Sequence, residues 1–183
     1  RFEALYAQLE RLPDLLEQVL DRRTVAQLQY DASRYFHNRD VFYIGRKLDS
    51  ATCLEGSLKL KEIAYLHSEA YAAGELKHGP ISLIEDGTLV VALATEPAMF
   101  DKTVSNIREV KSRGAEVLGL TIERLGEELQ KTVDSALLIP ETDPLFQPSL
   151  AIVPLQLFAY YMALMRGCDV DKPRNLAKSV TVE

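Results

Sequence analysis

The amino-acid sequence predicts an α/β fold in which helices cover both faces of a mainly parallel β-sheet. Short apolar runs alternate with longer stretches of helical periodicity along most of the 183 residues, and this alternation is typical of parallel sheets. One run, LVVALA at 89–94, is apolar throughout, as expected for a central strand buried on both faces. With 47% hydrophobic residues, the chain can bury one core of ordinary size.

The first half of the chain predicts two helices, a strand, a third helix and a short second strand. The first helix has leucines at helical spacing and is interrupted by Pro13. The first strand ends at Gly45, which indicates a turn, and the third helix has Asp49 or Ser50 as its expected N-cap. These five elements cover residues 2–19, 25–38, 41–44, 49–67 and 69–72.

The second half continues the alternation and ends in a long apolar helix. Gly114 and Gly167 follow two of its helices, where glycine commonly terminates a helix, and Pro140 ends the last strand. The elements cover residues 89–94, 99–113, 117–122, 125–133, 136–139 and 149–166. Because parallel sheets bind ligands beyond the carboxyl ends of their strands, the Gly45-Arg46-Lys47 turn and the following helix start could attract an anion.

Composition excludes several classes of protein. A net charge of −6 without a large basic cluster argues against a nucleic-acid surface. No apolar run reaches about 18 residues, so we expect no transmembrane helix and no membrane partner. Two cysteines, Cys53 and Cys168, in no metal-binding pattern fit a reducing cytoplasm. The chain opens mid-helix without Met or a signal peptide, which suggests an excised fragment.

Three charged residues, Glu55, Lys59 and Glu62, lie at i, i+4 and i+7 of the third helix and therefore share one stripe. The more common interpretation is a solvated face with an ion pair that stabilises the helix by about 0.3–0.5 kcal/mol. The alternative is a site in which a carboxylate accepts a proton and the lysine positions an oxyanion.

Two histidines and one lysine are further candidates. His78 precedes Gly-Pro, which places it in a loop, where an isolated histidine is usually a surface residue. His67 has no third partner at metal spacing, so we expect no metal site. Lys178 lies in an apolar tail, LAKSVTV; the tail is either frayed or packed, and a packed, desolvated lysine could attack a carbonyl. Nucleotide-loop motifs are absent, so no cofactor is predicted.

Two segments, LEGSLKLKEIAYLHSEAYAAGELKHGP at 54–80 and CDVDKPRNLAKSVTVE at 168–183, carry a family resemblance. The chain resembles the C-terminal part of the glucosamine-6-phosphate synthase (glutamine–fructose-6-phosphate aminotransferase, isomerizing) family. The resemblance implies a sugar isomerase (SIS) domain with a doubly wound, three-layer αβα sandwich, the second of two such domains. We expect N-terminal helices at 1–40, the SIS domain at 41–167 and a catalytic tail at 168–183.

The resemblance also implies roles for particular residues. Lys178 matches the lysine that forms a Schiff base with the ketose, and Glu62 matches the glutamate that moves a proton between the first two sugar carbons. Lys59 is similar to the assisting lysine, and His78 to the ring-opening histidine that serves the neighbouring subunit. The backbone around Ala177 is implied to line the sugar pocket, with a sugar phosphate as ligand and a homodimer as assembly.

Two parts of the family's full-length enzyme have no counterpart in the sequence: the glutaminase domain and the first SIS domain, whose Ser/Thr-rich loop cradles the phosphate. We therefore expect this chain to be inactive alone. Two other functions stay open, a regulatory domain that binds a sugar phosphate without turnover and a structural half for dimerisation. The joint presence of Glu62 and Lys178 counts against the regulatory domain.

Overall fold

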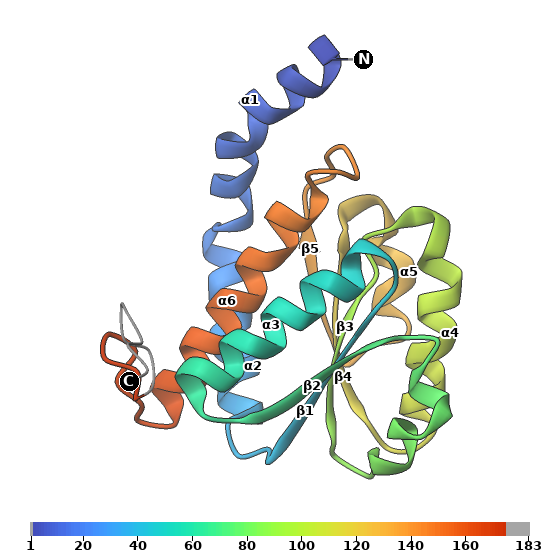
Figure 1. The fold of residues 1–183 in the computed structure, drawn as a ribbon, viewed down its shortest axis with the longest axis vertical. Helices are drawn as coiled ribbons and strands as arrows, with labels where there is room; N and C mark the ends of the chain where they lie inside the picture. The colour runs from blue at the N-terminus through green and yellow to red at the C-terminus, as the bar shows by residue number, and fades with distance from the viewer. Residues whose placement is uncertain (1, 175–183) are drawn as a thin grey trace, which may run out of the picture.

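The computed structural model describes residues 2–174 and contains a five-stranded parallel sheet with helices on both faces (Figure 1). The strand order β2-β1-β3-β4-β5 reverses direction between β1 and β3, which confirms the predicted doubly wound αβα sandwich. The strands are β1 Asp40–Gly45, β2 His67–Ala72, β3 Leu89–Leu93, β4 Glu116–Ile122 and β5 Ser135–Ile139. The helices are α1 Phe2–Val19, α2 Arg22–Tyr35, α3 Leu48–Ala64, α4 Phe100–Lys111, α5 Gly126–Gln130 and α6 Gln147–Met165.

Alternate residues along each strand feed two separate cores. On β1, Tyr43 faces the core formed with α2, α3 and α6, whereas Phe42 and Ile44 face the core formed with α4. On β3, Val91 faces the core formed with α2, α3 and α6, and Val90 faces the core formed with α4. Because strand side chains alternate between faces, a strand buried on both sides must be apolar at every position, as the sequence of β3 is.

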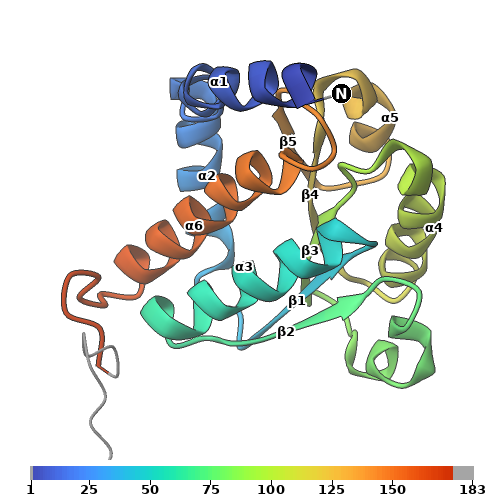
Figure 2. The same cartoon turned by 45° about the horizontal axis from the view of Figure 1, so that its top comes forward.

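The long helix α6 is the centre of one helical layer. Figure 2 shows it lying between α3 and α2 across one face of the sheet, and Gly56 of α3 allows close packing, since a Cβ there would lie 2.6 Å from Leu155 Cδ1. By length and composition α6 alone among the described helices could span a membrane. However, Leu155, Phe158 and Met162 are fully or almost fully buried in the protein core, which is the packing of a core helix.

Two helices begin differently from the sequence prediction. Helix α2 begins at Arg22 rather than 25, because the carboxylate of Asp21 accepts a 2.7 Å bond from Thr24 N and caps the helix. Neither Asp49 nor Ser50 is the N-cap of α3; Lys47 occupies that position without a side-chain cap. Asp49 is instead buried in the first turn and accepts bonds from Thr95 N and Glu96 N, 2.8 and 3.3 Å long, beyond the end of β3.

The two N-terminal helices differ in how much of their surface is buried. α2 places Leu28, Ala32 and the carboxylate-bearing Asp31 in the interior. In α1 only Leu15 and Val19 are buried, and its first half projects away from the sheet (Figure 1). The side chains that these two helices bury in the protein interior therefore belong mostly to α2 and to the last turns of α1.

Asp31 predicts a measurable pH dependence of stability. Burial raises the pKa of its carboxyl above 3.8, although Ser135 and Gln27 donate hydrogen bonds to it. A raised carboxyl pKa favours the folded state at low pH, and this contribution is lost as the pH rises through the folded pKa. The free energy of unfolding of Asp31→Asn relative to the unmodified chain should therefore increase between about pH 4 and pH 7, measured by urea denaturation.

Asp21→Asn provides the matched control, because its relative stability should stay nearly constant between about pH 4 and pH 7. The backbone hydrogen bond from Thr24 lowers the pKa of Asp21 below 3.8, so its contribution is present above that value and lost on acidification. A relative stability of Asp31→Asn that stays constant over this pH range would contradict the prediction.

Candidate functional site

The outer face of α3 carries the charged stripe predicted from spacing. Lys59 Nζ lies 2.8 Å from Glu62 Oε2 and 3.2 Å from Glu55 Oε1, so one ammonium joins two carboxylates. The hydrogen bond to Glu62, followed by that to Glu55, raises the pKa of Lys59 and keeps the amine protonated. The Glu62 side chain is 21% exposed, which leaves it accessible to a ligand.

The rest of α3 explains why this stripe faces outward. Leu60 is buried against the core, which turns the inner face of the helix toward α6. Lys61 Nζ donates to Ser57 Oγ at 3.0 Å and to Ser68 O at 2.9 Å, and this bridge fastens the helix to β2. The core contact of Leu60 and the hydrogen bonds of Lys61 together fix the rotation of α3 about its axis, and so keep the charged stripe on its outer face.

Exposed apolar side chains accompany the stripe. Leu54 and Leu58 lie on α3 with 60% and 41% of their surface exposed. Neighbouring exposed apolar side chains such as these are found on surfaces that another part of a protein covers.

The C-terminal segment returns to the C-terminal end of α3. Arg166 Nε donates to Ala64 O at 3.0 Å, and the Oη of Tyr65 accepts a 2.8 Å bond from Arg174 N. Tyr65 follows Glu62 by three residues, or about one helical turn. The other two predicted site residues, Ala177 and Lys178, lie outside the described residues.

His78 is not brought together with Glu62. It ends the short 3-10 helix Leu76–His78, and the neighbouring Leu76 packs in the core on the α4 side of the sheet. Helix α3 packs on the opposite side, with α6. His78 is exposed, so its imidazole is available to a molecule that approaches from outside this chain.

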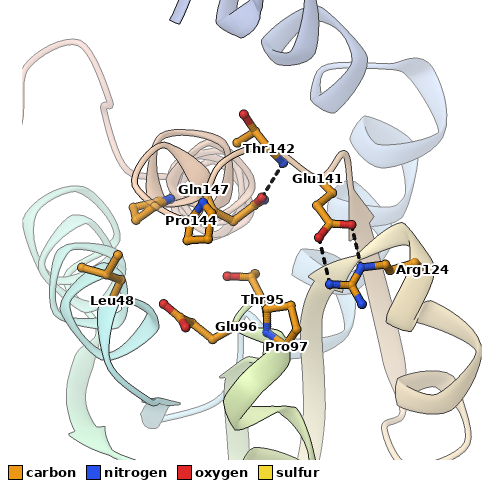
Figure 3. A pocket seen from close by; sticks show the side chains of 10 residues that line it. Leu48, Thr95, Glu96, Pro97, Arg124, Glu141, Thr142, Pro144 and Gln147 are labelled. Atoms are coloured by element: carbon orange, nitrogen blue, oxygen red, sulfur yellow. Dashed lines mark hydrogen bonds and ion pairs between the residues drawn. The ribbon is translucent and has the colours of Figure 1, made fainter. Parts of the chain in front are cut away.

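A small cavity of about 150 Å³ lies where parallel sheets usually bind ligands, beyond the carboxyl ends of β3, β4 and β5 (Figure 3). Glu96, Arg124 and Glu141 supply its charges. The Arg124 guanidinium is already held by Glu141 through two bonds of 2.6 and 2.9 Å. Two carboxylates and one engaged guanidinium do not suit a phosphate dianion.

The sequence suggested an anion site at the Gly45-Arg46-Lys47 turn, where both cations have partners within the protein. Arg46 Nη2 donates to Asn106 Oδ1 at 2.8 Å, which turns the guanidinium toward α4. Lys47 Nζ lies 3.8 Å from Glu96 Oε2. Both cations therefore have protein partners.

Neither the cavity nor the tyrosine at the end of α3 was predicted from the sequence. Glu96, Arg124 and Glu141 each follow the end of a different strand, and a charged residue at that position was the sequence signal that could have indicated the cavity.

Among residues 2–174, no three metal-ligating side chains gather at one point. His67 Nδ1 pairs with Asp40 Oδ1 at 2.7 Å.

Comparisons with known proteins agree with this architecture. The SIS domain family profile matches residues 35–166. Glutamine–fructose-6-phosphate aminotransferase [isomerizing] of Clostridium tetani is 54% identical over 181 residues, which are 99% of this chain and 29% of that protein. The same-named protein of Thermus thermophilus is 47% identical, over 99% of this chain and 30% of its own length. The chain thus spans less than a third of these relatives.

Solved structures show the same fold. The C-terminal domain of glucosamine-fructose-6-phosphate aminotransferase from Francisella tularensis aligns with a TM-score of 0.85 and 31% identity, over 91% of this chain and 46% of that one. A putative tagatose-6-phosphate ketose/aldose isomerase from Clostridium novyi NT aligns with a TM-score of 0.83 at 20% identity, over 99% of this chain and 49% of that one. The second likeness concerns the fold alone.

Proposed function

This chain belongs to the SIS domain family, and we propose that it forms the second half of the isomerase part of an enzyme that makes glucosamine 6-phosphate. The substrates of that enzyme would be fructose 6-phosphate and ammonia derived from glutamine. The observation that carries the proposal is the Lys59–Glu62 pair, one turn from the point where the C-terminal segment is fastened to α3. The 54% identity to a glutamine–fructose-6-phosphate aminotransferase supports the same reaction.

In the proposed mechanism the amine of Lys178 attacks the carbonyl of the open-chain sugar, and loss of water gives a Schiff base. Ammonia then displaces the Lys178 amine from the imine carbon, so that the sugar carries an imine of ammonia and the lysine is released. Glu62 takes a proton from the first sugar carbon and returns it to the second, while protonated Lys59 stabilises the negative charge that develops on the oxygen of the first carbon. Lys178 is four residues beyond Arg174, and four residues span at most about 14 Å. Within that reach of Arg174, we propose that Lys178 meets Glu62 and that the backbone at Ala177 lies beside the sugar.

The phosphate group requires a partner outside this chain. The carboxyl-end cavity presents carboxylates, and the cations of the 45–47 turn are engaged. We therefore propose that the preceding SIS domain of a longer chain covers the outer face of α3 and holds the phosphate. A glutaminase domain would supply ammonia, and the assembly would be a cytoplasmic homodimer. The domain boundaries after residues 40 and 167, which separate the N-terminal helices, the SIS domain and the C-terminal tail, stay a prediction.

Borohydride trapping tests the proposal in the full-length enzyme. Fructose 6-phosphate and borohydride should attach the sugar covalently to Lys178, located by peptide mass spectrometry. Lys178→Arg should abolish trapping and turnover without unfolding the protein, because a guanidinium stays protonated. The isolated 183-residue chain should give no turnover with ammonia. Trapping at another lysine would contradict the mechanism.

The exposed position of His78 predicts a composite site in a dimer. Because the histidine lies across the sheet from α3, we expect it to act in the site of a second copy. Mixing full-length His78→Ala and Lys178→Ala proteins, each inactive, should restore part of the activity after subunit exchange. Lack of recovery after exchange has been verified would show that each site is built from a single chain.

A further inference from the structure

Asp49 lies at the topological switch point of the sheet. The strand order reverses between β1 and β3, and the crevice beyond the carboxyl ends of two such strands is the usual ligand site of doubly wound sheets. Gly45 ends β1 and lies so close to the start of α3 that a Cβ there would be 2.7 Å from the carbonyl carbon of Asp49. Thr95, just beyond the end of β3, bonds to the Asp49 side chain. Asp49 therefore spans the ends of both strands.

Three hydrogen-bond donors converge on the Asp49 carboxylate. Its Oδ2 accepts bonds from Thr95 N at 2.8 Å and from Glu96 N at 3.3 Å, and its Oδ1 accepts a 2.5 Å bond from Thr95 Oγ1. Successive backbone N–H groups and a hydroxyl are donors with which proteins hold phosphate and carboxylate ligands. Asp49 is also in the first turn of α3, where the helix dipole favours a negative charge. The donor set of an anion site is therefore present, and a side chain of the protein fills it.

The burial of Asp49 closes this position to molecules from outside. Only 2% of the residue is exposed. Thr95 and Glu96 also line the small cavity of Figure 3. A ligand that entered this cavity would find the N–H groups of both residues already bonded to Asp49. These donors are therefore withheld from an anion that approaches from solvent.

We propose that Asp49 is an internal substitute for an anionic ligand, and that it excludes phosphate and carboxylate ligands from the switch point of this chain. Removal of the side chain would leave the same buried donors without a partner, and a small oxyanion that restored their hydrogen bonds would stabilise the folded chain. The inference goes beyond the proposed function and does not depend on it. For any phosphorylated ligand it has one consequence: the phosphate group must be held outside the crevice between β1 and β3.

The first measurement is thermal unfolding of the 183-residue chain in about 100 mM sodium acetate, formate or chloride, at about pH 8, where carboxylates are ionised. Asp49→Gly removes a group the size of acetate, and Asp49→Ala removes a group the size of formate. Acetate should raise the melting temperature of Asp49→Gly by at least about 3 °C over chloride, and formate should do the same for Asp49→Ala. Both shifts are taken relative to the unmodified chain, which removes general effects of the salts.

Two aspartate variants provide matched controls. Asp49→Asn leaves the position filled by a neutral group of the same shape, so acetate should not stabilise it. Asp31→Gly removes another fully buried carboxylate, whose partners are the Ser135 hydroxyl and the Gln27 amide rather than backbone N–H groups. These side chains can turn to other partners, so acetate should stabilise Asp31→Gly much less than Asp49→Gly. Equal effects in the two glycine variants would mean that acetate fills any buried aspartate cavity, and the inference would fail.

Backbone amide resonances locate the bound anion. In Asp49→Gly, titration with acetate or inorganic phosphate should shift the resonances of Thr95 and Glu96 until the site is saturated. Addition of Thr95→Val to this variant removes the hydroxyl donor and should weaken acetate binding about fivefold. In the unmodified chain, neither inorganic phosphate nor fructose 6-phosphate should move the two resonances.

Each outcome supports or overturns the inference. Shifts of Thr95 and Glu96 by phosphate in the unmodified chain would show that the switch point is open. A response of Asp49→Gly to acetate but not to phosphate would overturn the statement about phosphate. If Asp49→Gly is unfolded in chloride, recovery of the native circular dichroism spectrum in acetate supports the inference, and an unchanged spectrum contradicts it. None of these measurements requires turnover, so a full-length enzyme that traps no Schiff base would refute the proposed function without affecting them.

Discussion

Replacing Glu62 by glutamine in the full-length enzyme is expected to lower kcat by about a hundredfold to ten-thousandfold, the usual contribution of a positioned general base. Glutamine keeps the shape of the side chain but cannot accept the proton that, in the proposed mechanism, moves between the two sugar carbons. The Lys59 amine, 2.8 Å away in the unmodified chain, would remain to stabilise the oxyanion. The measurement is steady-state turnover together with exchange of the substrate's carbon-bound hydrogen into deuterated water.

Glu55→Gln is the matched control on the same helix. Glu55 also pairs with Lys59, at 3.2 Å, but lies seven residues, or about 10 Å along the axis, from Glu62. It should change kcat only a few-fold, because it removes the same charge without removing the base. Equal losses in Glu55→Gln and Glu62→Gln would assign the effect to the charge around Lys59 and would refute the role of Glu62 as base.

Phe158→Ala is expected to lower the free energy of unfolding by about 3–5 kcal/mol, the largest stability effect that we predict. Phe158 is fully buried at the middle of α6, in the core shared with α2, α3 and the sheet. Removal of the ring loses its transfer free energy and leaves a cavity that the surrounding helices can fill only in part. Urea denaturation of the 183-residue chain provides the measurement.

Leu164→Ala tests whether the loss of unfolding free energy in Phe158→Ala reflects the burial of that side chain. Leu164 lies on the same helix with 45% of its surface exposed, and its removal should cost well under half as much as that of Phe158. Similar values for the two variants would mean that helix propensity, rather than the core, determines the stability of α6.

Most of the fold could be predicted from periodicity, because β1, β3 and β4 are mainly apolar and most of the helices are long. The near-continuous run of β3 could be recognised since it is buried on both faces. Helix ends were less predictable, since they depend on contacts made by single side chains. Asp49 shows the limit: its type and position suggested a cap, whereas its carboxylate bonds to Thr95 and Glu96, more than 40 residues away.

The candidate site, like the fold, could be predicted only in part from the sequence. The pairing of Lys59 with Glu55 and Glu62 follows from helix geometry and is confirmed at 3.2 and 2.8 Å. The separation of His78 from α3 depends on which face of the sheet each segment crosses, which spacing does not reveal. The contact of Tyr65 with Arg174 joins segments 109 positions apart, and no local pattern encodes it.

The place of α6 in the chain has a consequence for synthesis on the ribosome. It is the last helix in the sequence order of the described residues, yet it packs in the core against α2 and α3, which are made much earlier. Until Met165 has left the exit tunnel, this face of the newly made sheet, with α2 and α3, lacks the helix that packs between them. A nascent chain paused after β5 should therefore bind chaperones, and folding of this layer should follow release of the C-terminal end.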